Sequence, residues 1–206
     1  MQRKLLSPDP QRPAILARIR WLFRHLPTGG HLLFFDVKPV AVKFYGGRCY
    51  TLAKRLVLAR NQKTYGRFYL FVSYDAQSGQ AHWRFLPGKG AKYVAQFLYH
   101  LRKWYPEVPI WVVLDQDRAH PCKSRLTRQV MRELHFHWIS LPKGSPDDNP
   151  VETIFSDIQL MILDNSNDTD AKCTQHRISA HLRGRNRRKD RLIHVPYLYP
   201  RHSHTH

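Results

Sequence analysis

Three acidic residues have the types and positions best suited to chemistry in this chain. Asp36 and Asp115 each end an apolar run, and Glu152 lies in the first turn of an expected helix. Carboxylate oxygens are the ligands that Mg²⁺ and Mn²⁺ prefer in proteins. Two such ions side by side promote cleavage and transfer at phosphodiester bonds. The three residues therefore raise the hypothesis of a metal-dependent reaction at phosphate.

The two aspartates are expected at the carboxyl ends of strands. In open sheets with parallel strands, ligands gather outside these ends, so two neighbouring strands would project both carboxylates into one crevice. A single aspartate after a strand also commonly begins a turn or caps a helix. Asp75 is interpreted in that simpler way, because residues 75–79 separate two alternating, aromatic-rich segments and predict a hairpin.

Glu152 has two explanations that the sequence leaves open. The segment Asn149-Pro-Val-Glu152 has the residue types of a helix start, with Asn at the cap and Glu three positions later. A capping box would account for this glutamate without any catalysis. However, Glu152 lies about 100° from Val151 around the helix, at the flank of the apolar stripe. From that position its side chain could also reach the strand-end carboxylates.

The surrounding segments alternate between helix and strand patterns. Apolar residues recur at helical spacing in 14–26, 91–105, 123–135 and 149–163, and strand patterns cover 31–36, 65–74, 81–86, 109–115 and 136–141, with a further candidate at 48–52. In the helix at 123–135 we expect the apolar residues to face the core, namely Leu126, Val130, Met131 and Leu134. A hairpin followed by strand-helix-strand-helix predicts an α/β fold whose mixed sheet carries helices on its faces and whose later strands are parallel.

The charge of the chain favours a nucleic-acid partner. Lysine and arginine number 34 against 15 acidic residues, which gives a formal net charge of +19 and a pI near 10.3. Candidate phosphate-binding residues are Lys123, Arg125, Lys143, Arg183, Arg185, Arg187, Arg188, Lys189 and Arg191. Lys89, in a glycine-rich loop before a helix, could also meet a phosphate, although a plain connection is the simpler explanation.

Composition also predicts the compartment and the division of the chain. Three widely spaced cysteines, no signal-peptide pattern and no long apolar run predict a soluble, cytoplasmic, nucleoid-associated protein without a membrane partner. We expect a basic N-terminal helix and linker at 1–30, a catalytic domain at 31–164 and a solvated basic arm at 165–206. The histidine-rich residues 202–206 could bind metal, but a disordered tail is the simpler interpretation.

Two segments resemble a known family. In residues 110–120 a strand ends in Asp115 and His120 follows five residues later, and residues 138–152 contain Leu-Pro, Ser-Pro and Asn-Pro-Val-Glu in that order. Both segments are similar to DDE transposases of the insertion sequence 630 family, relatives of the mariner elements. Thirty-six residues separate Asp115 from Glu152, close to the mid-thirties interval of that family.

The resemblance covers residues 32–163 and implies a ribonuclease-H-like fold. It implies Asp36, Asp115 and Glu152 as a catalytic triad that holds two Mg²⁺ or Mn²⁺ ions, with Asp36 shared between them. The activity implied is hydrolysis of a DNA strand, followed by attack of the freed 3′-hydroxyl on target DNA. Asn149 is a candidate accessory residue. His120 would orient a carboxylate or contact the scissile phosphate, unless it only supports a helix start.

The chain departs from the family pattern at several positions. Gln116 replaces the usual asparagine, Asp117 adds a carboxylate, and Phe155 and Gln159 stand where tryptophan and lysine are common. The family usually carries helix-turn-helix domains ahead of the catalytic domain, whereas about thirty residues precede the first expected strand here. We therefore expect DNA as the partner, with a separate helix-turn-helix subunit or reading-frame product, and a homodimer, as further candidates.

Two other functions remain open at this point. One is a catalytically inactive, transposase-derived protein that binds DNA through its charge. The other is a histidine- and zinc-based nuclease built from the 13 histidines. The second is disfavoured because His135 and His137 only flank a predicted strand start and no HExxH spacing occurs.

Overall fold

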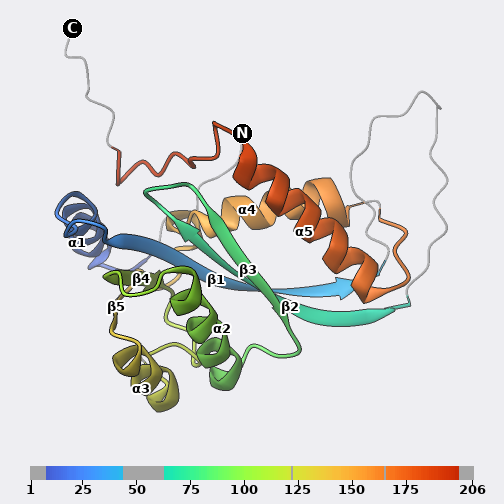
Figure 1. Ribbon diagram of the computed structural model, residues 1–206, viewed down its shortest axis with the longest axis horizontal. Helices are drawn as coiled ribbons and strands as arrows, with labels where there is room; N and C mark the ends of the chain where they lie inside the picture. Colours follow the sequence, from blue (N-terminus) through green and yellow to red (C-terminus); the bar gives the residue numbers. More distant parts are fainter. Residues whose placement is uncertain (1–7, 44–62, 122, 165, 200–206) are drawn as a thin grey trace, which may run out of the picture.

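The structure is a computed structural model that describes residues 8–43, 63–121, 123–164 and 166–199 (Figure 1). The candidate strand at 48–52 and the histidine-rich residues 202–206 lie outside the described residues. Within the described part, no helix is both long enough and apolar enough to cross a membrane.

One mixed sheet forms the centre of the described molecule. Its strands are β1 (His31–Val42), β2 (Gly66–Asp75), β3 (Ala81–Leu86), β4 (Ile110–Leu114) and β5 (Phe136–Ser140), in the order β3-β2-β1-β4-β5. The hairpin strands β2 and β3 are antiparallel, as are β1 and β2, while β1, β4 and β5 run parallel. The predicted mixed sheet with parallel later strands is thus confirmed.

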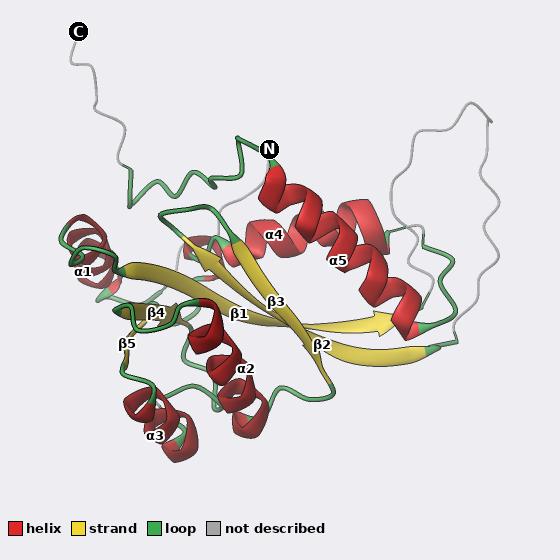
Figure 2. Cartoon of the chain, viewed as in Figure 1, coloured by secondary structure: helices red, strands yellow, loops and turns green. Residues whose placement is uncertain are grey.

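Helices cover both faces of this sheet (Figure 2). One face carries α1 (Arg12–Arg24), α4 (Val151–Ile158) with a π-helical turn at Gln159–Leu163, and α5 (Ala171–Arg187). The other face carries α2 (Ala91–Trp104) and α3 (Arg125–Glu133). Successive β1 residues point to opposite faces, so Leu32 and Phe34 pack toward the first group and Leu33 and Phe35 toward the second.

The expected strand at 31–36 is longer than its apolar run. β1 continues to Val42, but its pairing with β4 ends at Phe34, and only β2 accompanies it further. Asp36 therefore lies just past the parallel part of the sheet instead of at the end of the strand. The extension was not apparent because Lys38 and Pro39 interrupt the apolar pattern.

The prediction of a solvated arm after residue 164 is wrong for residues 171–187. These residues form α5, which starts where the Asp170 carboxylate accepts a hydrogen bond from the Cys173 N–H at 3.2 Å. Ile178 and Leu182 are fully buried against the sheet. Only a narrow apolar stripe faces inward, and the many basic residues around it concealed the helical period.

The prediction that Leu126 of α3 faces the core is wrong. Ser124 caps this helix by accepting from the Thr127 N–H at 3.2 Å, and the Thr127 hydroxyl donates to the Ala119 carbonyl at 2.6 Å. These bonds turn Thr127 into the core, and Leu126 is left 43% exposed. Val130 and Met131 are buried as predicted.

Asp75 is confirmed as a turn residue. Its carboxylate accepts from the Gln77 N–H and the Ser78 hydroxyl, and Gly79 closes the turn with a φ of 72° that favours glycine. The same buried carboxylate also bonds the His31 ring at 2.9 Å and the Tyr105 hydroxyl at 3.2 Å. Asp75 thus links the hairpin to β1 and to the end of α2.

Candidate active site

A cleft of about 330 Å³ opens beyond the end of β4, between the loop after β5 and the start of α4. Asp36, Asp115 and Glu152 all line it. Asp36 continues the alternation of Leu32 and Phe34 on β1, so its side chain lies on the sheet face that α4 covers. The structure thus brings the three predicted acids to one cavity.

Asp36 is the most buried and most crowded of the three acids. Its Oδ1 accepts from the Val37 N–H at 2.7 Å, and its Oδ2 accepts from the Asn149 side-chain amide at 3.3 Å. Burial, together with the negative charges of Asp115 and Glu152, raises the pKa of Asp36 to about 7. Asn149, an accessory candidate from the sequence, therefore contacts an acid of the cleft directly.

Glu152 does not form the capping box that the sequence allowed. The Asn149 N–H, which that motif would use, donates to the Pro146 carbonyl at 2.9 Å, while the Asn149 side chain accepts from the Val151 N–H at 3.2 Å. The Glu152 side chain instead lines the cleft together with Asp36. Burial raises the pKa of Glu152, although the positive charge of Lys38 partly opposes this. Glu152 therefore shares the cleft with the other two acids.

His120 holds the Asp115 carboxylate from behind the cleft. Its Nδ1 lies 2.6 Å from Asp115 Oδ1 and 3.0 Å from the Asp115 carbonyl, and the ring is buried against Phe35. Burial alone would raise the pKa of Asp115, but the His120 hydrogen bond and charge outweigh it and lower that pKa. The carboxylate-orienting role predicted for His120 is what the geometry supports. Its carbonyl also accepts from the Ser124 N–H, so it supports the turn before α3 as well.

Two of the residues that depart from the family pattern, Gln116 and Asp117, have structural partners at the cleft. The Gln116 side chain donates to the Leu141 carbonyl at 3.2 Å, which ties the loop after β4 to the loop after β5. Asp117 accepts from the Ala119 N–H at 2.9 Å and pairs with Lys89 at 3.6 Å. Asp117 lines the cleft but faces a lysine instead of the other acids.

The acids influence one another through their charges. The charges of Asp115 and Glu152 both raise the pKa of Asp36, and the charge of Asp115 also raises the pKa of Glu152. Across the described residues, no group of three or more histidine, cysteine, aspartate or glutamate side chains is compact enough to hold one metal ion.

The predicted phosphate-binding residues fall into three groups. Lys123 and Lys143 line the cleft, whereas Arg125 is exposed on α3 outside it. Four exposed residues lie at the end of α5 and just beyond it: Arg183, Arg187, Arg188 and Lys189. The third group, Arg185 and Arg191, is engaged by the protein itself.

The prediction that Arg185 binds phosphate is wrong, because its buried guanidinium cannot reach DNA. Arg185 is 4% exposed, and its guanidinium donates to the Gly79 carbonyl at 2.9 Å and to the Arg191 carbonyl at 2.7 Å. It also lies over the Tyr74 ring. Arg191 is half-buried and donates to the Ser78 carbonyl at 2.7 Å. Both arginines fasten the segment after α5 to the β2–β3 turn.

Asp148, which no sequence pattern indicated, fixes the loop that carries the cleft wall. Its carboxylate is 4% exposed and accepts two hydrogen bonds from the Arg12 guanidinium, at 2.7 and 2.6 Å. The Tyr197 hydroxyl donates to the Asp148 carbonyl at 2.7 Å. No local pattern reveals this cluster, because Arg12 is 136 residues away in the sequence.

The sequence matches the family described as DDE superfamily endonuclease over residues 31–175, which is more than half of the chain. No curated protein matches the sequence. Similar solved structures include a Mos1 transposase paired-end complex with the left transposon end, with a TM-score of 0.66, 14% identity and coverage of 96% of this chain. This chain spans 61% of the length of that protein.

A second similar structure is the catalytic domain of Mos1 mariner transposase alone. Its TM-score is 0.63 at 13% identity, with coverage of 96% of this chain and 89% of that domain. The match confirms the ribonuclease-H-like mixed sheet with helices on both faces. The family match and the fold agree over the segment that carries the cleft, and the chain therefore belongs to the DDE superfamily endonuclease family.

Proposed function

We propose that this chain is the catalytic domain of a DNA transposase, in which Asp36, Asp115 and Glu152 carry the reaction. The reaction proposed is hydrolysis of one DNA strand followed by attack of the freed 3′-hydroxyl on target DNA. Family membership and fold support a nuclease. The observation that carries the residue assignment is that Asp36, Asp115 and Glu152 line one cleft, while the Asn149 N–H that a capping box would use is bonded to Pro146 instead.

The donor chemistry of the cleft fits two Mg²⁺ or Mn²⁺ ions. Its acids offer only carboxylate oxygens, and the raised pKa of Asp36 reflects negative charge that a cation would neutralise. Asp36, Asp115 and Glu152 would hold these ions between them. Two similar structures are titled as Mos1 mariner paired-end complexes with Mn and with Mg. When bound, such ions activate the attacking oxygen and stabilise the leaving one.

The other residues of the cleft orient these acids and bind the DNA backbone. Asn149 holds Asp36 at 3.3 Å and His120 holds Asp115 at 2.6 Å, so both carboxylates are fixed before a substrate arrives. Lys123 and Lys143 on the cleft wall would contact phosphates without reading sequence. The exposed basic residues at the end of α5 would extend that contact along the DNA.

The test is nicking of supercoiled DNA by the purified chain with Mg²⁺ or Mn²⁺. Replacing Glu152 with Gln should reduce nicking at least about a hundredfold with DNA binding unchanged, because it removes one ligand charge. Asp117→Asn is the matched control, since Asp117 lines the same cleft but pairs with Lys89. The proposal is overturned if Glu152→Gln nicks normally, or if the unmodified chain binds DNA without ever nicking it.

If the unmodified chain binds DNA without nicking it, the protein is the catalytically inactive DNA-binding protein instead. Cleavage supported by Zn²⁺ but by neither Mg²⁺ nor Mn²⁺ would favour the histidine-based nuclease. DNA as the partner is part of this proposal, and similar structures are titled as complexes with transposon ends. A separate helix-turn-helix subunit, a homodimer and nucleoid association remain predictions, which co-purification and sedimentation of the complex would test.

A further inference from the structure

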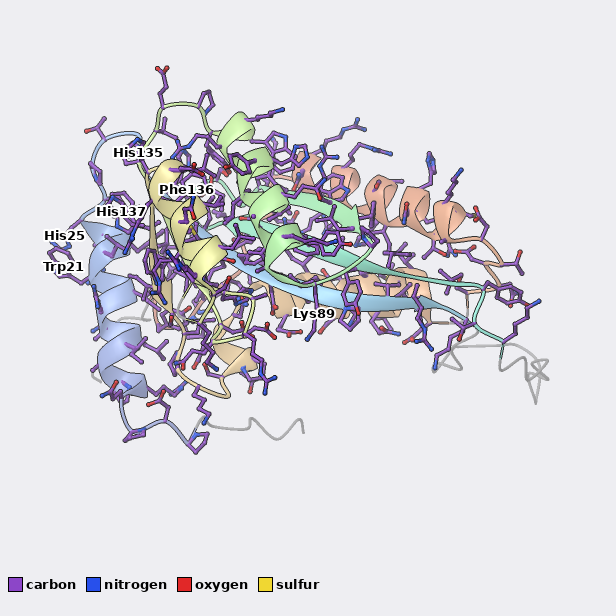
Figure 3. The ribbon with its side chains drawn as sticks, turned by 90° about the horizontal axis from the view of Figure 1, so that it is seen from below. Trp21, His25, Lys89, His135, Phe136 and His137 are labelled. Atoms are coloured by element: carbon purple, nitrogen blue, oxygen red, sulfur yellow. The ribbon has the colours of Figure 1, made fainter. Side chains whose placement is uncertain are left out.

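A second groove, outside the cleft, lies between α1 and β5. Its volume is about 640 Å³, and its walls are Arg18 and Trp21 from α1, Trp111 from β4 and the segment around His135 and His137. Figure 3 shows Trp21 and His25 on α1 alongside His135 and His137. β5 is the edge strand of the sheet, so the groove is open along one side.

Flat aromatic surfaces line this groove. Trp21 is 61% exposed and stacks on His25 with ring centroids 4.6 Å apart. Across the groove, Trp111 stacks on His137 at 4.9 Å, with the rings only 19° from parallel. An exposed tryptophan of this kind offers a large apolar face that a flat ring can cover.

The charge of the groove favours an anion. Arg18 and Arg132 are exposed on its rim, and its lining contains no aspartate or glutamate. Within the described part of the chain, neither arginine forms an ion pair. A second copy of this chain, itself carrying a formal net charge of +19, would be repelled from such a surface. The charge complementarity therefore selects a polyanion over a protein copy.

The position of the groove relates it to the cleft. Trp111 lies near the start of β4, and Asp115 directly follows the end of the same strand. Three residues lie between them along the strand, so their Cα atoms are about 13 Å apart. The groove and the cleft therefore lie near the two ends of one strand.

We propose that this groove binds an unpaired segment of the DNA strand that the cleft processes. The inference rests on the proposed function above. Trp21 supplies a stacking surface for a base, and Arg18 and Arg132 contact the adjoining phosphates. Unpaired DNA is selected because the bases of a duplex are already stacked on one another and cannot cover an isolated indole face.

The test compares binding of a short fluorescein-labelled single strand with that of the matching duplex, in EDTA. Trp21→Ala should weaken single-strand binding about tenfold and duplex binding less than twofold. Arg132→Ala should weaken single-strand binding about threefold and make the dependence of that binding on salt concentration shallower. Trp104→Ala and Arg24→Ala are matched controls: Trp104 also stacks on a histidine at 4.6 Å, and Arg24 is exposed on α1 outside the groove.

The outcomes separate this proposal from the proposed function. If the unmodified chain nicks DNA but Trp21→Ala binds single strands normally, the groove proposal alone is overturned. It is also overturned if Trp104→Ala weakens single-strand binding as much as Trp21→Ala. A shift from dimer to monomer in sedimentation of Trp21→Ala would make the groove a protein interface and overturn it too. If Trp21→Ala loses single-strand binding and keeps duplex binding, the groove proposal is supported even when the unmodified chain does not nick DNA.

Discussion

At the scale of single residues, the cleft depends on side chains that hold its acids in place. His120 and Asn149 each bond one carboxylate, and both are almost fully buried. A buried donor beside a carboxylate holds it in one orientation, and the His120 hydrogen bond and charge also lower the pKa of Asp115 and so keep it charged. Orientation of the acids is thus built into the fold before any ligand binds.

His120→Phe should therefore weaken Mn²⁺ binding about tenfold, because the ring packing is kept while the bond to Asp115 is lost. Titration calorimetry of the purified chain measures this. His120→Gln, which retains a donor, should recover part of the affinity. Equal Mn²⁺ affinity in the Phe variant and the unmodified chain would show that Asp115 needs no support from His120.

At the scale of elements, the sequence predicted the sheet and its helices but not every contact that fixes the cleft. β4, β5 and α4 were predictable because their apolar residues recur at the spacing of each element. α5 was missed because Arg185 occupies part of its inward face, where an apolar residue is the usual occupant. Asp148 was missed because its partners are distant in sequence and only the folded chain brings them together.

The Arg12–Asp148 pair makes a stability prediction that links α1 to the cleft loop. Arg12→Met should lower the free energy of unfolding by about 2 kcal/mol, because it leaves a buried carboxylate without its partner. Arg24→Met, at an exposed position on the same helix, should change it by less than about 0.5 kcal/mol. Denaturant titration measures both.

A double variant sharpens this prediction. Arg12→Met combined with Asp148→Leu should be more stable than Arg12→Met alone, since no unpaired charge then remains buried. If the free energy of unfolding of the double variant fell by the sum of the two single-variant losses, the two side chains would contribute independently. The ion pair would then not fix the loop.

At the scale of the whole molecule, a buried polar network joins the hairpin to β1 and α2. His82 Nε2 lies 2.8 Å from the Tyr105 hydroxyl, which donates to Asp75, and Asp75 also bonds His31. Burial lowers the pKa of His82 to about 4, although the charge of Asp75 partly opposes this. The folded chain therefore keeps His82 neutral at pH values where the unfolded chain protonates it.

The stability that neutral His82 contributes should consequently be lost as the pH drops from about 6.5 to 4. Over this window the unfolded state protonates His82 and the folded state does not, so His82 alone favours unfolding in acid by about 3 kcal/mol, with no effect above pH 7. Asp36 acts in the opposite direction, because its raised pKa lets the folded state bind a proton first. His82→Gln keeps a polar partner for Tyr105, and in denaturant titrations this variant should lose less stability than the unmodified chain between pH 6.5 and 4. An unchanged pH profile in that variant would assign the acid sensitivity to other groups.

Asp148 has a practical consequence for anyone who prepares a shorter fragment. Arg12 and Tyr197, which hold it from both sides, lie outside the family match at 31–175, as do the fully buried Ile178 and Leu182. A fragment trimmed to the matched boundaries would keep every acid of the cleft yet strip away two supports of the wall beside them. Expression boundaries for this chain should therefore follow the packing of the folded protein and not the limits of its sequence similarity.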